Sequence, residues 1–214
     1  DLKVWDYTGT ALAVIGKPIK HSLSPIMQNA ALEQLSLNDN RFKEWAYFRF
    51  EIDPEDLSEA LELFYQKRFL GLNLTVPHKV MALDLLKTIS NSAKAIGAVN
   101  TLKWTASGYE GFNTDGYGMS KGIEQGLGKG LNGNHVLILG AGGAARAAVV
   151  ECLSQKAASI RILNRSKDRL DAMLSSLSEL KGYESIIPIE AKEDLADLPE
   201  MGICINATSL GLNQ

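Results

Sequence analysis

Residues 72–80 (LNLTVPHKV) place two side chains that could carry a proton at the end of an expected buried strand. His78 has the more obvious chemistry, because an imidazole with its ordinary pKa of about 6.5 exchanges a proton near neutral pH. Lys79 could do the same if a carboxylate such as Asp115 lay beside it in a partly desolvated cleft. The spacing of the residues alone does not choose between His78 and Lys79.

A glycine-rich turn at residues 140–146 (GAGGAAR) offers a second kind of chemistry. Gly140, Gly142 and Gly143 fit the pattern G-x-G-G, and Ala145 stands where a strict dinucleotide fingerprint has its third glycine. Small residues there let backbone amides and the N-terminus of the next helix approach a pyrophosphate. The alternative is a tight turn that binds nothing, but an apolar strand before it and an alanine-rich helix after it favour dinucleotide binding.

The segment at residues 163–169 (LNRSKDR) indicates which dinucleotide would bind. A protein that selects NAD usually has an acidic residue here to hold the ribose 2′-hydroxyl. Asn164 and Arg165 occupy this place instead, with Ser166 and Arg169 nearby. A guanidinium can pair with the 2′-phosphate of NADP, which a carboxylate would repel. The alternative is a solvated basic loop, but its offset from the glycine turn favours NADP.

Apolar runs that alternate with helical patterns would position these residues. In the first half we expect strands at 11–16, 45–52, 70–76, 98–104 and 109–113, and helices at 25–35, from 53 or 54 onward, and at 79–86. On the first helix, one face carries the apolar residues Ile26, Met27, Ala30, Ala31 and Leu35. This alternation predicts an α/β fold with a mainly parallel sheet covered on both faces.

A second unit begins after the glycine-rich segment 122–134. Strands are expected at 135–140, 159–164 and within 202–211, with a helix at about 144–155. Repeated strand–helix units with glycine in the first turn resemble one half of a Rossmann domain. We therefore expect a substrate-binding and catalytic domain at 1–118 and an NADP-binding Rossmann-like domain, truncated at its C-terminus, at 119–214.

The composition argues against several classes of protein. The 214 residues are 45% hydrophobic and 22% charged, and the net charge of −3 gives no general reason to bind nucleic acid or anionic membrane. The sequence contains no run of about 18 apolar residues, so no segment is expected to span a membrane. Cys152 and Cys204 lie in apolar stretches and are expected as core residues of a cytoplasmic protein. The three histidines and two cysteines show no ligand spacing, so no metal is expected.

Six segments, in order, resemble the shikimate dehydrogenase family: GKPIKHSLSP, NLTVPHK, GAVNT, NTDG, GAGGAAR with LNRS, and NATSLG. Any one of them is weak evidence, and their joint order and spacing carry the resemblance. The family reduces 3-dehydroshikimate to shikimate with NADPH in aromatic amino acid biosynthesis, the chorismate pathway. The resemblance therefore implies an NADP-dependent oxidoreductase with a substrate domain and a Rossmann-type domain.

The resemblance also implies roles for single residues. The catalytic pair would be Lys79 and Asp115. Ser22 and Ser24 would hold the shikimate carboxylate. The ring hydroxyls would be surrounded by Thr75, Lys79, Asn100 and Asp115. The cofactor would contact Gly140, Ala141, Gly142, Gly143, Ala144, Asn164, Arg165, Ser166, Arg169 and Thr208, with Ala207 and Ser209 on the nicotinamide side. Lys79 then becomes the expected proton carrier, and His78 a structural neighbour.

These residues also have ordinary structural interpretations. Ser22 and Ser24 could be capping or turn residues, Asp115 an Asx-turn, Asn100 a partner for backbone groups, and Lys79 a solvated lysine. Hydroxyl and amide side chains nevertheless suit a polyhydroxylated acid, and reducing a ketone requires a proton donor at the oxygen that becomes an alkoxide. Their joint occurrence favours the functional interpretation.

The sequence departs from the family pattern by stopping after NATSLGLNQ. Beyond this point the family has further strands, a tyrosine and a glutamine that reach the substrate, and a terminal helix. Either the chain is a fragment or these parts are supplied as another chain. A protein that ended at Gln214 would be expected to bind NADP weakly and to have little activity. Two alternatives stay open: a quinate/shikimate dehydrogenase paralogue, and a non-catalytic ligand-sensing module. Small molecules are the expected partners, in a monomer or homodimer.

Overall fold

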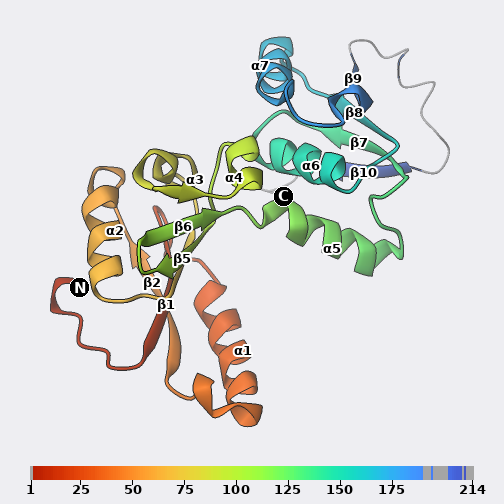
Figure 1. Cartoon of the computed structure of the whole chain (residues 1–214). Helices are drawn as coiled ribbons and strands as arrows, with labels where there is room; N and C mark the ends of the chain where they lie inside the picture. Colours follow the sequence, from red (N-terminus) through yellow and green to blue (C-terminus); the bar gives the residue numbers. More distant parts are fainter. Residues whose placement is uncertain (1, 190–193, 195–201, 209, 211–214) are drawn as a thin grey trace. The chain divides into compact units, whose positions relative to one another are not determined.

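The computed structural model describes residues 2–189, 194, 202–208 and 210 (Figure 1). The chain forms two compact units, Asp1–Asn113 and Thr114–Gln214. The predicted domain boundary after residue 118 lies further along the chain, inside helix α5 (Asp115–Leu127). The functional assignment of the two domains stays a prediction.

Unit 1 contains a sheet of six strands in the order β2-β1-β3-β5-β6-β4. The strands are β1 (Thr10–Gly16), β2 (Trp45–Glu51), β3 (Gly71–Leu74), β4 (Thr88–Ile89), β5 (Thr101–Thr105) and β6 (Gly108–Phe112). Strand β1 is parallel to β2 and β3, whereas β5 is antiparallel to both of its neighbours, β3 and β6. The predicted mainly parallel sheet therefore also contains a β5–β6 hairpin.

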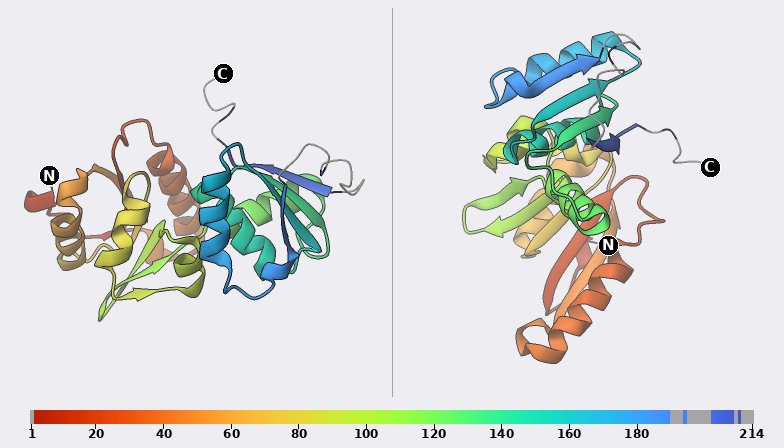
Figure 2. Two further views of the ribbon diagram at one scale, coloured as in Figure 1. Left: turned by 90° about the horizontal axis from the view of Figure 1, so that it is seen from above. Right: turned by 90° about the vertical axis from the view of Figure 1, so that its right-hand side faces the viewer.

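The helices of unit 1 cover both faces of this sheet (Figures 1 and 2). They are α1 (Ser24–Asn38), α2 (Leu57–Gln66), α3 (His78–Met81) and α4 (Asn91–Ile96), with short 3-10 turns η1 (Leu2–Val4), η2 (Asn40–Phe42), η3 (Pro54–Asp56) and η4 (Ala82–Leu85). Alternate residues of β1 serve the two faces: Ala13 and Ile15 join the core that α2 closes with Phe64, while Val14 joins Leu32 of α1. The alternation of side chains along a strand produces these two cores.

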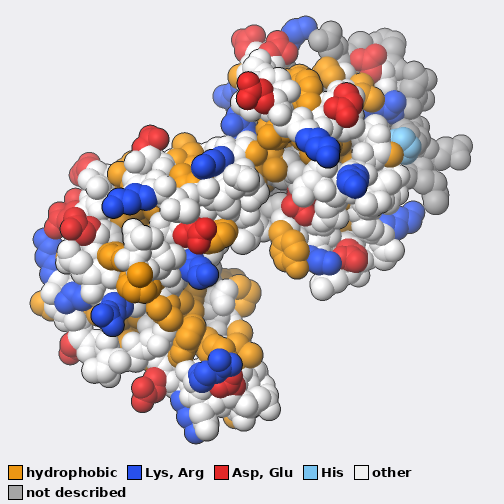
Figure 3. All heavy atoms as spheres, viewed as in Figure 1, with side chains coloured by type: hydrophobic (Ala, Val, Ile, Leu, Met, Phe, Trp, Pro, Cys, Tyr) orange, Lys and Arg blue, Asp and Glu red, His pale blue; other side chains and the backbone are white. Residues whose placement is uncertain are grey.

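The apolar face predicted for α1 does not pack on the sheet. Ile26 is 73% exposed and Met27 62% exposed, whereas Leu32 is buried, and hydrophobic side chains appear on the surface of this region (Figure 3). The side-chain amide of Asn29 explains the orientation, because it donates to the carbonyl of Tyr47 and accepts from its N–H. These two hydrogen bonds turn the face with Asn29 and Leu32 toward β2.

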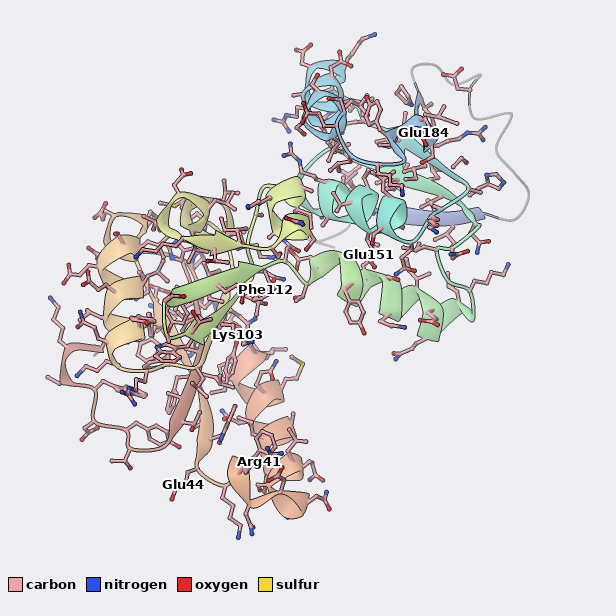
Figure 4. All side chains as sticks on the ribbon, viewed as in Figure 1. Arg41, Glu44, Lys103, Phe112, Glu151 and Glu184 are labelled. Carbon is pink, nitrogen blue, oxygen red and sulfur yellow. The ribbon has the colours of Figure 1, made fainter. Side chains whose placement is uncertain are left out.

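Unit 2 contains an all-parallel sheet in the order β10-β7-β8-β9. The strands are β7 (His135–Leu139), β8 (Ser159–Leu163), β9 (Ile186–Ile189) and β10 (Gly202–Asn206), and the helices are α5, α6 (Gly143–Ser154), α7 (Lys167–Leu177) and the turn η5 (Tyr183–Ser185). Part of the segment expected as a glycine-rich connection is the end of α5. Helix α5 packs on α6, where a Cβ at Gly116 would lie 2.9 Å from the carbonyl oxygen of Ala147, and Glu151 lies on this side of α6 (Figure 4).

The two cysteines differ in environment. Cys152 is buried between α6 and the sheet, and burial raises the pKa of its thiol to about 12. Cys204 is exposed, so the expectation that it is a core residue was wrong. Strand β10 pairs with β7 and buries Ile203, so the next side chain, Cys204, points to the opposite face.

None of the helices in the described part of the chain is long and apolar enough to cross a membrane.

Candidate active site

The corner between β3 and α3 brings three of the predicted substrate residues onto neighbouring segments. Thr75 follows β3, and its N–H donates to the carbonyl of Ile15 on β1 over 3.0 Å. Lys79 lies in the first turn of α3, and its carbonyl accepts from the N–H of Val99 at 2.8 Å. The carbonyl of Asn100 accepts from the N–H of Leu74 at 2.9 Å. The backbone therefore gathers Thr75, Lys79 and Asn100 at the end of β3.

His78 points away from solvent into the core of unit 1. Its side chain is fully buried, and Nε2 lies 2.9 Å from the carbonyl oxygen of Ile52. Because a carbonyl only accepts, Nε2 carries the hydrogen, and Nδ1 has no hydrogen-bond partner among the described residues. Burial lowers the pKa of His78, so the ring is neutral near pH 7. Lys79 is half-buried, which leaves it better placed than His78 to meet a ligand.

A chain of hydrogen bonds orients the side-chain amide of Asn100, which is buried. Tyr47 donates its hydroxyl to Oδ1 of Asn73 at 2.7 Å, and Nδ2 of Asn73 donates to Oγ1 of Thr101 at 3.2 Å. The Thr101 hydroxyl in turn donates to Oδ1 of Asn100 at 2.9 Å. Burial raises the pKa of Tyr47, so the phenol stays protonated and can donate to Oδ1 of Asn73, which only accepts.

Sequence reasoning missed the contributions of Tyr47 and Thr101 to this network. Tyr47 lies on β2, 26 positions away from Asn73 in the sequence. A weak signal was available in β3 and the residue after it, where the polar residues Asn73 and Thr75 alternate with Leu72 and Leu74. Two polar residues on one face of a strand with an otherwise apolar pattern indicate a polar network or a site.

Ser22 lies in the loop between β1 and α1, and Ser24 is the first residue of α1. Leu23 occupies the N-cap position of α1, and no described side chain caps the helix there, so neither serine is an N-cap residue. The Ser22 hydroxyl instead accepts from the N–H of Ser24 at 3.3 Å, while the N–H of Ser22 donates to the carbonyl of Ile19 at 3.0 Å. These contacts order the loop locally. The peptide bonds before Pro18 and Pro77 are both cis.

Asp115 is the first residue of α5 and is exposed. A carboxylate in the first turn of a helix interacts favourably with the helix dipole. The N-cap residue is Thr114, so Asp115 does not cap the helix. Lys79 belongs to unit 1 and Asp115 to unit 2, and the pairing of the two side chains stays a prediction.

The glycine turn after β7 has two kinds of glycine. Gly140 has φ of +117°, and an added Cβ would lie 2.9 Å from the carbonyl oxygen of Ala207 and 3.3 Å from the Thr208 side chain. A Cβ at Gly142 or Gly143 would meet no described atom within 4 Å, and no described side chain caps α6 at Gly142. The N-terminus of a twelve-residue helix is therefore bare and approachable, which fits a pyrophosphate. Thr208 lies beside Gly140, and its contact with the cofactor stays a prediction.

The end of β8 lies next to this turn, because the N–H of Gly140 donates to the carbonyl of Leu163 at 2.8 Å. Asn164 donates from Nδ2 to the carbonyl of Ser166 at 2.7 Å. The Ser166 hydroxyl caps α7, accepting from the N–H of Arg169 at 3.5 Å. Arg165 and Arg169 are both exposed, in positions where a guanidinium can meet an anion. Of the predicted nicotinamide-side residues, Ser209 lies outside the described residues.

In the described part of the chain, no cluster of three or more His, Cys, Asp or Glu side chains could hold a metal ion. Nδ1 of His135 forms a hydrogen bond with the hydroxyl oxygen of Ser159 at 2.8 Å.

Comparison with known proteins identifies the family. A family described as "Shikimate dehydrogenase substrate binding domain" matches residues 14–102, and one described as "Shikimate / quinate 5-dehydrogenase" matches residues 123–210. The shikimate dehydrogenase (NADP(+)) of Geobacter metallireducens is 37% identical over 98% of this chain and 72% of its own length.

Solved structures agree with these sequence matches. The crystal structure of shikimate dehydrogenase from Aquifex aeolicus has a TM-score of 0.80 and 32% identity, covering 98% of this chain and 73% of that one. Shikimate 5-dehydrogenase from Thermus thermophilus, crystallised with NADP(H) and shikimate, has a TM-score of 0.77 and 33% identity, covering 95% of this chain and 70% of that one.

A mixed α/β unit followed by a parallel sheet with a glycine turn at a helix N-terminus is the architecture of two-domain, nucleotide-dependent oxidoreductases. With relatives of this identity over most of their length, the chain belongs to the shikimate dehydrogenase family.

Proposed function

We propose that this protein is an NADP-dependent shikimate dehydrogenase, which interconverts 3-dehydroshikimate and shikimate in the biosynthesis of aromatic amino acids. The observation that carries the proposal is the ordered match of both family descriptions to the two halves of the chain. The NADP(+)-dependent relative and the Thermus complex with NADP(H) and shikimate support the choice of ligands. As proposed, the enzyme acts in the cytoplasm, as a monomer or homodimer, on small molecules alone.

The substrate side of the reaction falls to polar residues of unit 1. Ser22 and Ser24 hold the carboxylate of shikimate, and Thr75 and Asn100 hold its ring hydroxyls. Hydrogen bonds between neutral polar groups fix the orientation of a ring that has several similar hydroxyls. The Tyr47–Asn73–Thr101 chain supports this role of Asn100, because it keeps the amide from rotating.

Proton transfer falls to Lys79 with Asp115. NADPH supplies a hydride to the carbonyl carbon, and the oxygen must gain a proton to become the hydroxyl. Lys79 gives that proton through its ammonium group, and in the reverse direction takes it back. Asp115 stabilises the ammonium form and fixes its geometry. His78 takes no part in this step, because its N–H is already bound to Ile52 in the core.

The cofactor side falls to unit 2. The backbone of Gly140, Ala141, Gly142, Gly143 and Ala144 would hold the pyrophosphate at the N-terminus of α6. Asn164, Arg165 and Ser166, with Arg169 nearby, would hold the 2′-phosphate, and Thr208 would lie toward the nicotinamide. The bare helix N-terminus and the exposed guanidinium at position 165 support this assignment.

Initial rates with shikimate and quinate, each with NADP and NAD, test the proposal directly. The expected result is turnover of shikimate with NADP at a kcat/KM well above that for the other pairs. Efficient turnover of quinate would favour the quinate paralogue, which the second family description also names. Binding of shikimate without turnover would favour a ligand-sensing module.

A further inference from the structure

Strand β2 carries charged residues on the face of the sheet that α1 covers. Phe48 and Phe50 face the core closed by α2, and Ile52 follows them. The alternate residues Arg49 and Glu51 therefore face the α1 side of the sheet, and Asp53 continues the same alternation just beyond the strand. Tyr47, earlier on this face, is buried with Leu32.

Each of these three side chains contacts a different point of the loop at residues 17–20. The guanidinium of Arg49 donates to the carbonyl of Lys20, and the carboxylate of Asp53 pairs with the ammonium of Lys17. The carboxylate of Glu51 accepts from the backbone N–H of Ile19 at 3.3 Å. The contacts of Arg49 and Glu51 are with backbone groups, so they fix the backbone conformation of the loop.

The same loop is fixed by backbone and apolar contacts. The N–H of Lys17 donates to the carbonyl of Val76 at 3.0 Å, and Ile19 is buried against Leu32 and Tyr47. The N–H of Ser22 then donates to the carbonyl of Ile19 at 3.0 Å. Ser22 is thus attached directly to the residue whose N–H Glu51 holds.

These contacts are poorly suited to stabilising the whole fold. Arg49 and Glu51 are exposed, and the Lys17–Asp53 pair is about half exposed on both sides. Exposed ion pairs contribute little to global stability. Asp53 also occupies the N-cap position of η3 without a side-chain cap among the described contacts, so its carboxylate serves the loop and not the helix turn.

We propose that Arg49, Glu51 and Asp53 are positioning residues that hold the loop at residues 17–20 so that Ser22 and Ser24 are ordered before the substrate carboxylate binds. The proposal rests on the proposed function for the role of the two serines. A loop ordered in advance loses less conformational freedom on binding, so the benefit appears in substrate affinity. The three side chains are proposed to act only on the binding of the substrate carboxylate, and the proposed cofactor residues lie in unit 2, so cofactor affinity and the rate of the bound complex should not depend on Arg49, Glu51 and Asp53.

The test compares a triple variant, Arg49→Ala, Glu51→Ala and Asp53→Ala, with the unaltered protein. We expect the KM for shikimate to rise roughly three- to tenfold, the scale of one or two lost hydrogen bonds, while kcat and the KM for NADP change by less than about twofold. Glu51→Gln keeps an acceptor oxygen for the N–H of Ile19 and should restore most of the affinity that Glu51→Ala loses. Glu59→Ala on α2, which removes an exposed pair with Lys3 of η1, is the matched control and should change nothing.

A second measurement reads the loop without using activity. Trypsin can cut after Lys20, and we expect faster cleavage at this bond in the triple variant, with an unchanged melting temperature. An unchanged KM for shikimate together with unchanged cleavage overturns the proposal, as does an equal loss of kcat and of both affinities. If the triple variant does not fold, the single changes Arg49→Ala and Glu51→Ala at exposed positions give the same readouts. Absence of shikimate turnover in the unaltered protein refutes the proposed function, and the cleavage rates then still decide whether the three side chains hold the loop.

Discussion

Replacing Gly142 and Gly140 by alanine, one at a time, should separate cofactor binding from folding within one turn. Gly142 has φ of −93° and ψ of −170°, which alanine adopts freely, and the added methyl group meets no described atom within 4 Å. Gly142→Ala should therefore change the free energy of unfolding by less than about 1 kcal/mol. Gly140 has φ of +117°, and its added methyl group would lie 2.9 Å from a backbone oxygen. Gly140→Ala should lower the free energy of unfolding by about 2–4 kcal/mol.

Gly142→Ala, which should hardly change stability, should have a large effect on the binding of NADP. The methyl group of Gly142→Ala would fill the space through which the pyrophosphate is proposed to approach α6. Losing one charge-assisted hydrogen bond of about 1.5–3 kcal/mol corresponds to a rise in the KM for NADP of roughly 10- to 150-fold. The KM for shikimate should stay within about twofold, because the change lies outside unit 1.

Thermal melts followed by circular dichroism and initial rates with varied NADP provide both readouts. Gly140→Ala should lower the melting temperature by roughly 4–15 °C, and Gly142→Ala should hardly move it. If Gly142→Ala binds NADP like the unaltered protein, the segment is an ordinary strand–helix turn and the assigned pyrophosphate site is wrong. If Gly140→Ala melts normally, the positive φ and the contact with Ala207 carry no cost, and the structural reasoning fails.

Three further changes test other parts of the site. Lys79→Ala should lower kcat by roughly two to four orders of magnitude, the scale of lost acid–base help, whereas Lys87→Ala on the same unit should not; an unchanged rate would contradict the role of Lys79. Arg165→Ala should raise the KM for NADP and leave the use of NAD alone, and equal effects on both cofactors would exclude the phosphate contact. Burial lowers the pKa of His78, so the unfolded chain binds the proton more readily, and stability should fall as the pH drops below about 6.5. His78→Phe should weaken that dependence in denaturant unfolding at several pH values, and an unchanged slope would show that another group is responsible.

The order of strands and helices was predictable because it depends on local patterns. The apolar runs at residues 135–140 and 159–164 became β7 and β8, and the Ser-Gly turn before Tyr109 became the β5–β6 hairpin. The expected helix at 79–86 is divided into α3 and η4, and α4 was not foreseen at all. A helix of six residues such as α4 has too few turns to show a period, and Ser90 at its N-cap was the main available signal.

The orientation of α1 could not be predicted from its own residues. Periodicity finds an apolar face, but it does not say whether that face meets the sheet. The orientation of α1 is set by Asn29, whose side-chain amide hydrogen-bonds both backbone groups of Tyr47 and so places a polar residue at the helix–sheet contact. Such a choice depends on a partner 18 positions away in the sequence, which only the fold brings near.

The choice between His78 and Lys79 shows how the fold adds to a motif. The two residues are neighbours, so any argument from spacing treats them alike. In a helical turn, however, adjacent side chains point about 100° apart, so only one of them can face the core. The carbonyl of Ile52, just after β2, needs a donor in that core, and the ring of His78 supplies it at 2.9 Å. With His78 bound in the core, Lys79 is the one of the two that α3 can direct outward. His78, whose ordinary pKa is nearer neutrality, therefore holds α3 in place, and Lys79 is the residue proposed to transfer the proton.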